Sequence, residues 1–214
     1  MHLQTSDQEK MSLGFRDYTC NWGAHICGLY ETEGERDEII TGFLHTGDIS
    51  GDFQIFIPSE QSAEEFKAGY CRRYPDCCGH IHDQSKFSIV KPEEFYYPDG
   101  KFDRFRMIES HNEYYKNSQR EGKRNIRATA EMVWALKKMP GIEDLMAYES
   151  SLNYFFPGKP WVSICLYNIS RFSGSIIMNV LQTHPWVISG GVITQNPFYI
   201  EPSEWLALNA PEYR

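Results

Sequence analysis

The sequence lacks the motifs by which common nucleotide-binding and hydrolytic folds are recognised. It contains no Gly-x-Gly-x-x-Gly, no Gly-Lys-Ser/Thr phosphate loop and no Gly-x-Ser-x-Gly nucleophile elbow. It also lacks a basic excess, because 21 Lys and Arg stand against 29 Asp and Glu, a net charge of −8. A protein that neutralises nucleic-acid phosphates normally carries the opposite sign. The sequence therefore predicts neither a hydrolase of these classes nor direct contact with DNA or RNA.

The sequence has no uninterrupted apolar run of about 20 residues, the length that a membrane-spanning helix needs. Residues 172–200 contain no Asp, Glu, Lys or Arg, but polar side chains and prolines interrupt them throughout. Residues 1–14 are polar, which predicts a flexible leader rather than a signal peptide, and residues 15–214 are predicted to form one domain. We therefore expect a cytoplasmic protein without a membrane partner, in which the six cysteines are free thiols.

Short apolar runs alternate with longer amphipathic segments along the chain. The apolar runs predict strands at 25–30, 53–57, 87–90, 125–130, 161–167, 187–189 and 192–194. The amphipathic segments predict helices that begin at Thr32 and at 62, 104, 142 and 173. This alternation predicts an α/β fold of three layers, in which helices cover both faces of a mainly parallel sheet.

The loop after the first predicted strand is where such a fold would bind a nucleotide. Residues 31–36 carry three glutamates, a single glycine and no lysine. Thr32 and Glu35 have the spacing of a capping box, which predicts the helix start at this point. Carboxylates at a helix N-terminus repel phosphate, so no nucleotide cofactor is expected.

Cysteine and histidine gather between residues 71 and 82. Cys77, Cys78, His80 and His82 are candidate ligands for zinc, because thiolate and imidazole favour that ion. Their spacing matches no standard zinc motif, and the alternative is a polar surface loop with reduced thiols.

A ligand crevice is predicted beyond the carboxyl ends of the strands, where open parallel sheets bind small molecules. Aromatic walls would exclude water there, while an acid and a base would orient a polar group of the ligand or pair with each other. The same aromatics could instead be plain core, and a histidine at a strand start or before proline is often structural. The predicted ligand-binding residues are Tyr30, Glu131, Trp134, Tyr167 and Arg171, together with His25 and His184.

Six stretches occur in a fixed order between about residue 15 and residue 206. They are 23–30, 97–103, 131–136, 148–153, 165–168 with 171–173, and 183–185 through 196–199. Together they resemble the MEDS family, the sensory domains named for methanogen and methylotroph regulators. The resemblance implies a RecA/KaiC-like architecture without a working phosphate loop. It also implies a ligand-sensing role, with small hydrocarbon derivatives as signals.

The chain departs from the family pattern at two points. The family's usual Tyr-Asp after the fifth strand is Tyr167-Asn168 here, which removes a carboxylate from the expected crevice. The segment from Cys71 to His82 lies where the family is variable, so the resemblance assigns it no role.

Three functions remain open on the sequence. The leading hypothesis is a sensory domain that binds a small molecule and signals through a regulator, a kinase or self-association into a homo-oligomer. The second is a metal- or redox-responsive sensor that uses residues 71–82. The third is an enzyme in which Glu131 or Glu149 acts as general base, since a buried carboxylate near aromatics has a raised pKa.

Overall fold

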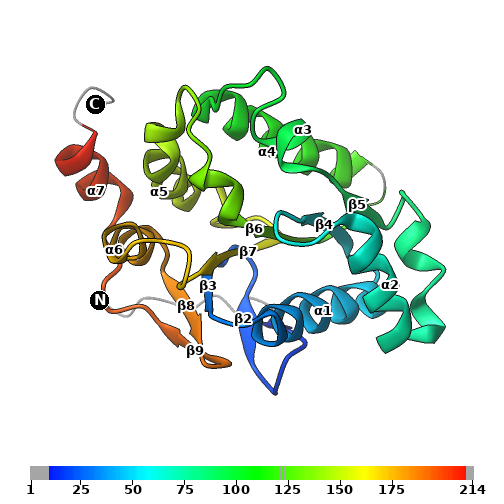
Figure 1. Cartoon of the computed structure of the whole chain (residues 1–214). Coiled ribbons are helices and arrows are strands. Elements are labelled where there is room, and N and C mark those ends of the chain that lie inside the picture. Colours follow the sequence, from blue (N-terminus) through cyan, green and yellow to red (C-terminus); the bar gives the residue numbers. More distant parts are fainter. Residues whose placement is uncertain (1–9, 121, 123, 211–214) are drawn as a thin grey trace, which may run out of the picture.

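The computed structural model describes residues 10–120, 122 and 124–210, and its centre is a seven-stranded sheet (Figure 1). The strand order is β5-β4-β6-β7-β3-β8-β9, and every pairing in it is parallel except that of β8 with β9. The strands are β3 (His25–Tyr30), β4 (Phe53–Ile57), β5 (Phe87–Ile89), β6 (Ile126–Glu131), β7 (Trp161–Asn168), β8 (Trp186–Ser189) and β9 (Val192–Gln195). The α/β class and the mainly parallel sheet are confirmed.

Helices cover both faces of this sheet (Figure 1). One face packs on α1 (Glu33–Ser50) and α2 (Ala63–Arg73). The other packs on α4 (Arg104–Arg120), α5 (Leu145–Phe155) and α6 (Gly174–Thr183). The shorter helices are α3 (Pro92–Phe95), α7 (Pro202–Asn209) and the 3-10 turns η1 (Pro75–Cys77), η2 (His80–His82), η3 (Met132–Leu136) and η4 (Ile142–Asp144). None of the helices in the described ranges has the length and apolar character to cross a membrane.

The central strand β7 explains why the sequence shows apolar runs rather than alternation. Its odd positions, among them Trp161 and Tyr167, face α4 and α5, whereas Ile164 and Leu166 face α1. Because both faces are covered, residues 161–167 are buried on both faces, and all of them except Ser163 are apolar.

Local signals in the sequence fix several helix and strand ends. Thr32 and Glu35 form the predicted capping box, and Ser62 caps α2 in the same way with Glu65. Gly190 and Gly191 join β8 to β9 with positive φ angles of 56° and 70°, a turn that favours glycine.

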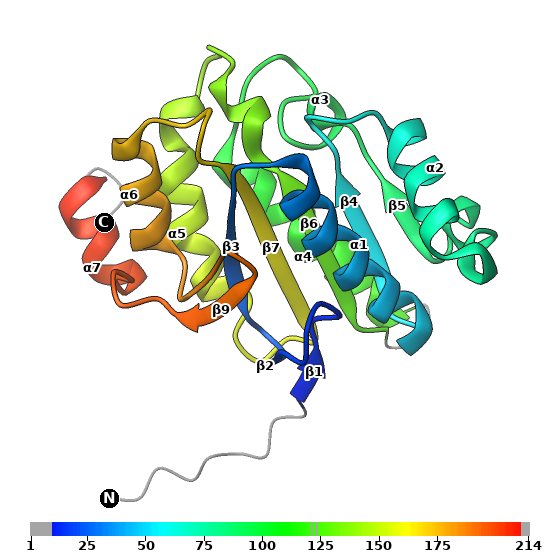
Figure 2. The same cartoon turned by 60° about the horizontal axis from the view of Figure 1, so that its bottom comes forward.

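The predicted leader is ordered over its last residues. Lys10–Ser12 form β1, which pairs antiparallel with β2 (Thr19–Asn21) at one end of the sheet (Figure 2). Leu13 is completely buried, and the Ser12 carbonyl oxygen accepts a hydrogen bond from Arg127 Nη1 at 2.7 Å. The leader prediction is therefore corrected for residues 10–14, while residues 1–9 lie outside the described part of the chain.

Candidate functional site

The pleat of the sheet separates the predicted ligand-binding residues into two groups. Tyr30 packs in the core on the α1 side, and Glu131 forms an ion pair with Arg36 of α1. Tyr167 packs on the opposite side, against α5. Side chains at the ends of parallel strands share one edge of the sheet but point to either of its two faces. A prediction that uses the edge alone therefore combines residues that lie on opposite faces.

On the α1 side, Glu131 holds the loop that follows β4. Its buried carboxylate accepts hydrogen bonds from the backbone N–H groups of Ser59 and Glu60 and from Gln61 Nε2, the last at 2.8 Å. Arg36 Nε lies 3.4 Å from the same carboxylate. Glu131 therefore positions the start of the connection to α2.

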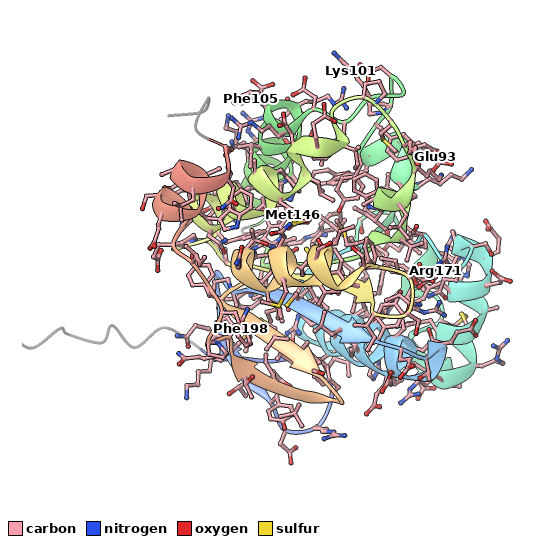
Figure 3. The ribbon with its side chains drawn as sticks, turned by 60° about the vertical axis from the view of Figure 1, so that its left-hand side comes forward. Glu93, Lys101, Phe105, Met146, Arg171 and Phe198 are labelled. Carbon is pink, nitrogen blue, oxygen red and sulfur yellow. A yellow bond between two sulfur atoms is a disulfide. The ribbon has the colours of Figure 1, made fainter. Side chains whose placement is uncertain are left out.

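Glu60 is the second acid of this edge, and sequence reasoning missed it. The Tyr30 hydroxyl donates a hydrogen bond to the Glu60 carboxylate, and Asn168 Nδ2 donates a second at 3.2 Å. Burial and the neighbouring Glu60 raise the pKa of Tyr30 far above its usual range. Arg171, which is 54% exposed in the loop before α6 (Figure 3), pairs with Glu60 at 3.3 Å. Mutual pairing of Glu131 and Arg171, one of the two roles expected for them, is thus replaced by two pairs with different partners.

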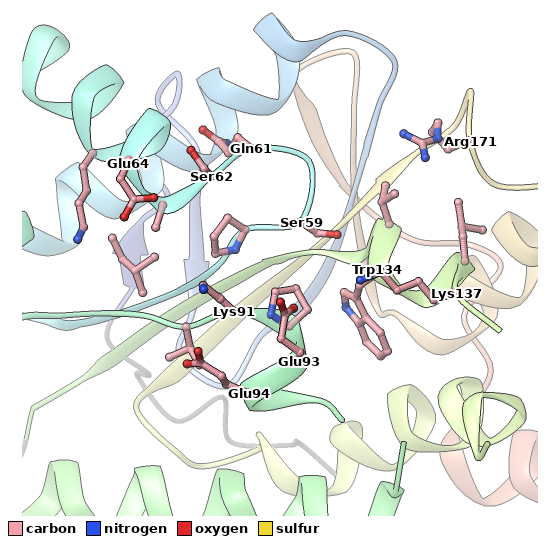
Figure 4. Close-up of a pocket in the computed structure, with 18 residues that line it drawn as sticks. Ser59, Gln61, Ser62, Glu64, Lys91, Glu93, Glu94, Trp134, Lys137 and Arg171 are labelled. Atoms are coloured by element: carbon pink, nitrogen blue, oxygen red, sulfur yellow. The ribbon is translucent and has the colours of Figure 1, made fainter. Parts of the chain in front are cut away.

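A pocket of about 950 Å³ lies beyond the carboxyl ends of β4 and β5. Figure 4 shows Gln61 on its α2 side, Lys91 and Glu93 after β5, and Trp134 with Lys137 across from them. The Trp134 ring is buried and stacks on Tyr96 with ring centroids 4.1 Å apart. Trp134 and Arg171, two of the predicted crevice residues, line this pocket.

At the start of α1, a glutamate of the helix itself takes up two backbone donors near the position where a phosphate would sit. Glu35 Oε2 accepts from the backbone N–H groups of Glu31 at 2.8 Å and Thr32 at 3.1 Å. These two hydrogen bonds lower the pKa of the Glu35 carboxyl, which keeps its negative charge. The carboxylate therefore takes the place that an anionic ligand would need.

We expect Mg-ATP and Mg-GTP not to bind this chain. The reason is the repulsion between their phosphates and the capping-box carboxylate. Isothermal titration calorimetry should give no measurable heat of binding, whereas a micromolar dissociation constant would contradict the prediction.

On the α5 side, three predicted residues meet deep inside the molecule rather than at the strand ends. His25 begins β3, His184 follows α6, and Tyr167 belongs to β7; they surround Glu149 of α5. Tyr167 donates a hydrogen bond to Glu149 Oε1 at 3.1 Å. Burial lowers the pKa of both histidines to about 3 and raises that of Glu149. This cluster is separate from the pocket and is completely enclosed.

The Cys/His segment does not bring its four predicted zinc ligands together. Cys78 is bonded to Cys71 in a disulfide, which corrects the expectation of free thiols for this pair. His80 Nδ1 lies 2.9 Å from Asp48 Oδ1. The Cys77 sulfur lies within 4.8 Å of ligand atoms of both residues. His82 lies instead beside the two sulfurs of the disulfide. The four residues are therefore split between two places by the short turns η1 and η2.

Comparison with known proteins decides the family. The model of the MEDS domain, the methanogen/methylotroph DcmR sensory domain, matches residues 24–185. The chain belongs to the MEDS family. This MEDS chain is 24% identical over 162 residues to the transcriptional repressor DcmR of Methylorubrum extorquens (strain DSM 6343 / CIP 106787 / DM4). The match covers 75% of this chain and 57% of that protein.

Among solved structures, the fold is similar to that of the KaiC-like protein PH0186 from Pyrococcus horikoshii OT3. The TM-score is 0.52 at 12% sequence identity, over 84% of this chain and 79% of that one. The RecA/KaiC-like architecture implied by the family resemblance is therefore confirmed. The MEDS assignment makes the chain a sensory domain of the kind found in regulators.

Proposed function

We propose that this MEDS chain senses a small organic molecule in the pocket beyond β4 and β5. The observation that carries the proposal is the place of that pocket. Ligands of open α/β sheets bind outside the carboxyl ends of the strands, and about 950 Å³ is ample for a small molecule. Trp134 and Arg171 were predicted as crevice residues from the sequence and line this volume.

The lining of the pocket indicates the class of ligand. Val133, Trp134 and Leu136 give an apolar wall, while Lys91 offers positive charge across from them and Lys137 offers it beside them. A hydrocarbon-derived molecule with one polar or anionic group would place its carbon skeleton on Trp134 and its polar group toward the lysines. The buried Trp134 Nε1 makes no hydrogen bond to the described residues and would donate to an acceptor oxygen of such a ligand.

The signal would pass to a regulatory partner. One relative is named a transcriptional repressor, and the match covers 57% of its length. A net charge of −8 disfavours direct contact between this chain and DNA. We therefore propose that binding is communicated to a regulator or kinase, or through self-association, in the cytoplasm.

The Trp134→Phe variant tests the pocket. We expect it to weaken ligand affinity about tenfold, the equivalent of about 1.4 kcal/mol, through loss of the indole N–H and part of the ring contact. Ligands would first be found by thermal shift against short-chain alcohols, carboxylates and halogenated alkanes, and affinities then measured by calorimetry.

Trp161→Phe is the matched control. Trp161 is equally buried, and its Nε1 likewise lacks a hydrogen bond among the described residues, but it lies outside the pocket. Equal loss of affinity in both variants, or a ligand-bound structure with density elsewhere, would refute the proposed site.

The disulfide favours a redox response as a second candidate function. The disulfide between Cys71 and Cys78 closes a loop that contains the last residues of α2 and the turn η1. Cys77, next to Cys78 in the chain, is a free thiol. In a reducing compartment such a bond opens and closes with the redox state. We expect dithiothreitol to speed amide hydrogen exchange in residues 74–86, and the Cys71→Ser/Cys78→Ser variant to match the reduced protein without reductant. Unchanged exchange on reduction would exclude this candidate.

A further inference from the structure

The buried cluster around Glu149 joins four side chains that are known metal ligands. They come from separate elements: His25 from β3, Glu149 from α5, Cys165 from β7 and His184 from the end of α6. Their exposed fractions are 1%, 0%, 5% and 0%. One ligand atom from each lies within 4.8 Å of the other three.

Four of the six separations between these atoms match the edges of a tetrahedral coordination shell. His25 Nε2 and His184 Nε2 lie 3.3 Å and 3.5 Å from Glu149 Oε2. Cys165 Sγ lies 3.6 Å from His25 Nε2 and 3.8 Å from Glu149 Oε2. With zinc–nitrogen and zinc–oxygen bonds of about 2.05 Å and a zinc–sulfur bond of about 2.3 Å, the tetrahedral edges are about 3.4 Å and 3.6 Å. Hydrogen bonds between imidazole and carboxylate are shorter, at about 2.7–2.9 Å.

Hydrogen bonds on the far side of each ring fix which nitrogen of His25 and His184 carries the proton. Asn153 Nδ2 donates to the Thr183 carbonyl oxygen at 2.7 Å, so Asn153 Oδ1 faces His25 Nδ1 at 3.2 Å and accepts from it. His184 Nδ1 donates to the Val180 carbonyl oxygen at 2.8 Å. Both Nε2 atoms therefore present lone pairs to the cluster. A second-shell acceptor of this kind accompanies most metal-binding histidines.

Tyr167 arranges the carboxylate in a similar way. Its hydroxyl donates to Glu149 Oε1, which leaves Oε2 as the single oxygen directed at the other three ligands. His184 Nε2 is buried and makes no hydrogen bond within the described ranges. One thiolate and one carboxylate would balance the charge of a divalent cation, which suits a site closed to water.

We propose that His25, Glu149, Cys165 and His184 bind one zinc ion in a closed tetrahedral site. Imidazole, thiolate and carboxylate are the ligands that zinc takes in proteins, and four protein ligands without an open position characterise structural sites. The ion would tie the neighbouring strands β3 and β7 to α5 and α6. This site is independent of the strand-end pocket and of the segment 71–82.

Metal analysis of the full-length protein expressed with zinc tests the site. We expect about one equivalent of zinc per chain in the wild type, and a loss of at least about tenfold in Cys165→Ser and His184→Gln. Cys27→Ser is the matched control, because Cys27 is the register partner of Cys165 on the neighbouring strand and is equally buried. Cys77→Ser controls for zinc on the surface segment. Both controls should keep about one equivalent.

Cobalt provides a readout on the wild type, which does not depend on whether the Cys165 and His184 variants fold. Wild-type protein refolded from denaturant with Co²⁺ should show a thiolate-to-cobalt charge-transfer band and the strong visible bands of tetrahedral cobalt. Tyr167→Phe keeps all four ligands, so it should keep these bands while metal affinity falls about tenfold or more. A wild type without bound metal after both expression and refolding would overturn the proposal. So would zinc that is lost in Cys77→Ser and retained in Cys165→Ser.

Discussion

Replacing Glu131 with alanine should lower the free energy of unfolding by about 3–5 kcal/mol, the cost of removing one partner from a buried charged network. The carboxylate is completely buried and accepts from the backbone N–H groups of Ser59 and Glu60. It is also an ion-pair partner of Arg36. Without it, the backbone N–H groups of Ser59 and Glu60 lose their acceptor, and the buried Arg36 guanidinium keeps, among the described residues, only its pair with Asp37.

Urea denaturation followed by circular dichroism measures this loss. Glu131→Gln keeps one acceptor oxygen and the side-chain volume, so its loss should be smaller, about 1–3 kcal/mol. Glu113→Ala, on the exposed surface of α4, is the control and should change stability by less than about 0.5 kcal/mol. A Glu131→Ala variant as stable as this control would show that the carboxylate does not hold the loop after β4.

The strands and helices were predictable because their signals are local. The run 53–57 became β4 with the same bounds, and the residues 104–120 became α4. The strand β1 was missed because three residues among polar neighbours are too few to show a hydrophobic periodicity. Its stability comes from pairing with β2 and from the burial of Leu13, which are contacts that a local pattern does not contain.

The site was predictable at the level of the sheet edge but not of the sheet face. Trp134 and Arg171, predicted from their place at the carboxyl edge of the sheet, line a pocket there. A prediction from the sheet edge alone does not separate Tyr30 from Tyr167, which lie on opposite faces. The alternation of side chains along each strand would have separated them. The meeting of His25 with Cys165 needs the pairing of β3 with β7, and the approach of Glu149 needs the packing of α5 on both. Neither follows from spacing in one sequence.

Acidification should destabilise the protein through His111 of α4. This ring is completely enclosed, donates from Nδ1 to the Met107 carbonyl oxygen and stacks on Trp161 with centroids 5.3 Å apart. Burial lowers the pKa of His111 from 6.5 to about 4. The unfolded chain therefore binds a proton at this residue before the folded chain does, so stability is complete above about pH 6.5 and falls as the pH drops toward about 4.

The size of this effect follows from the shift in pKa. A difference of about 2.5 units corresponds to about 3 kcal/mol at the acid end, of which about 1.4 kcal/mol should already be lost at about pH 5.5. His111→Phe keeps an aromatic ring against Trp161 but has no proton to bind. The free energy of unfolding of both proteins is measured in urea at about pH 7.5 and about pH 5.5. Between these two values the wild type should lose about 1.4 kcal/mol more than His111→Phe does. Phe155→Leu removes a neighbouring ring without a titrating group, so it should lower stability equally at both pH values. Equal pH dependence in the wild type and His111→Phe would mean that His111 takes up its proton in the folded state, and that the enclosed ring is reached by water.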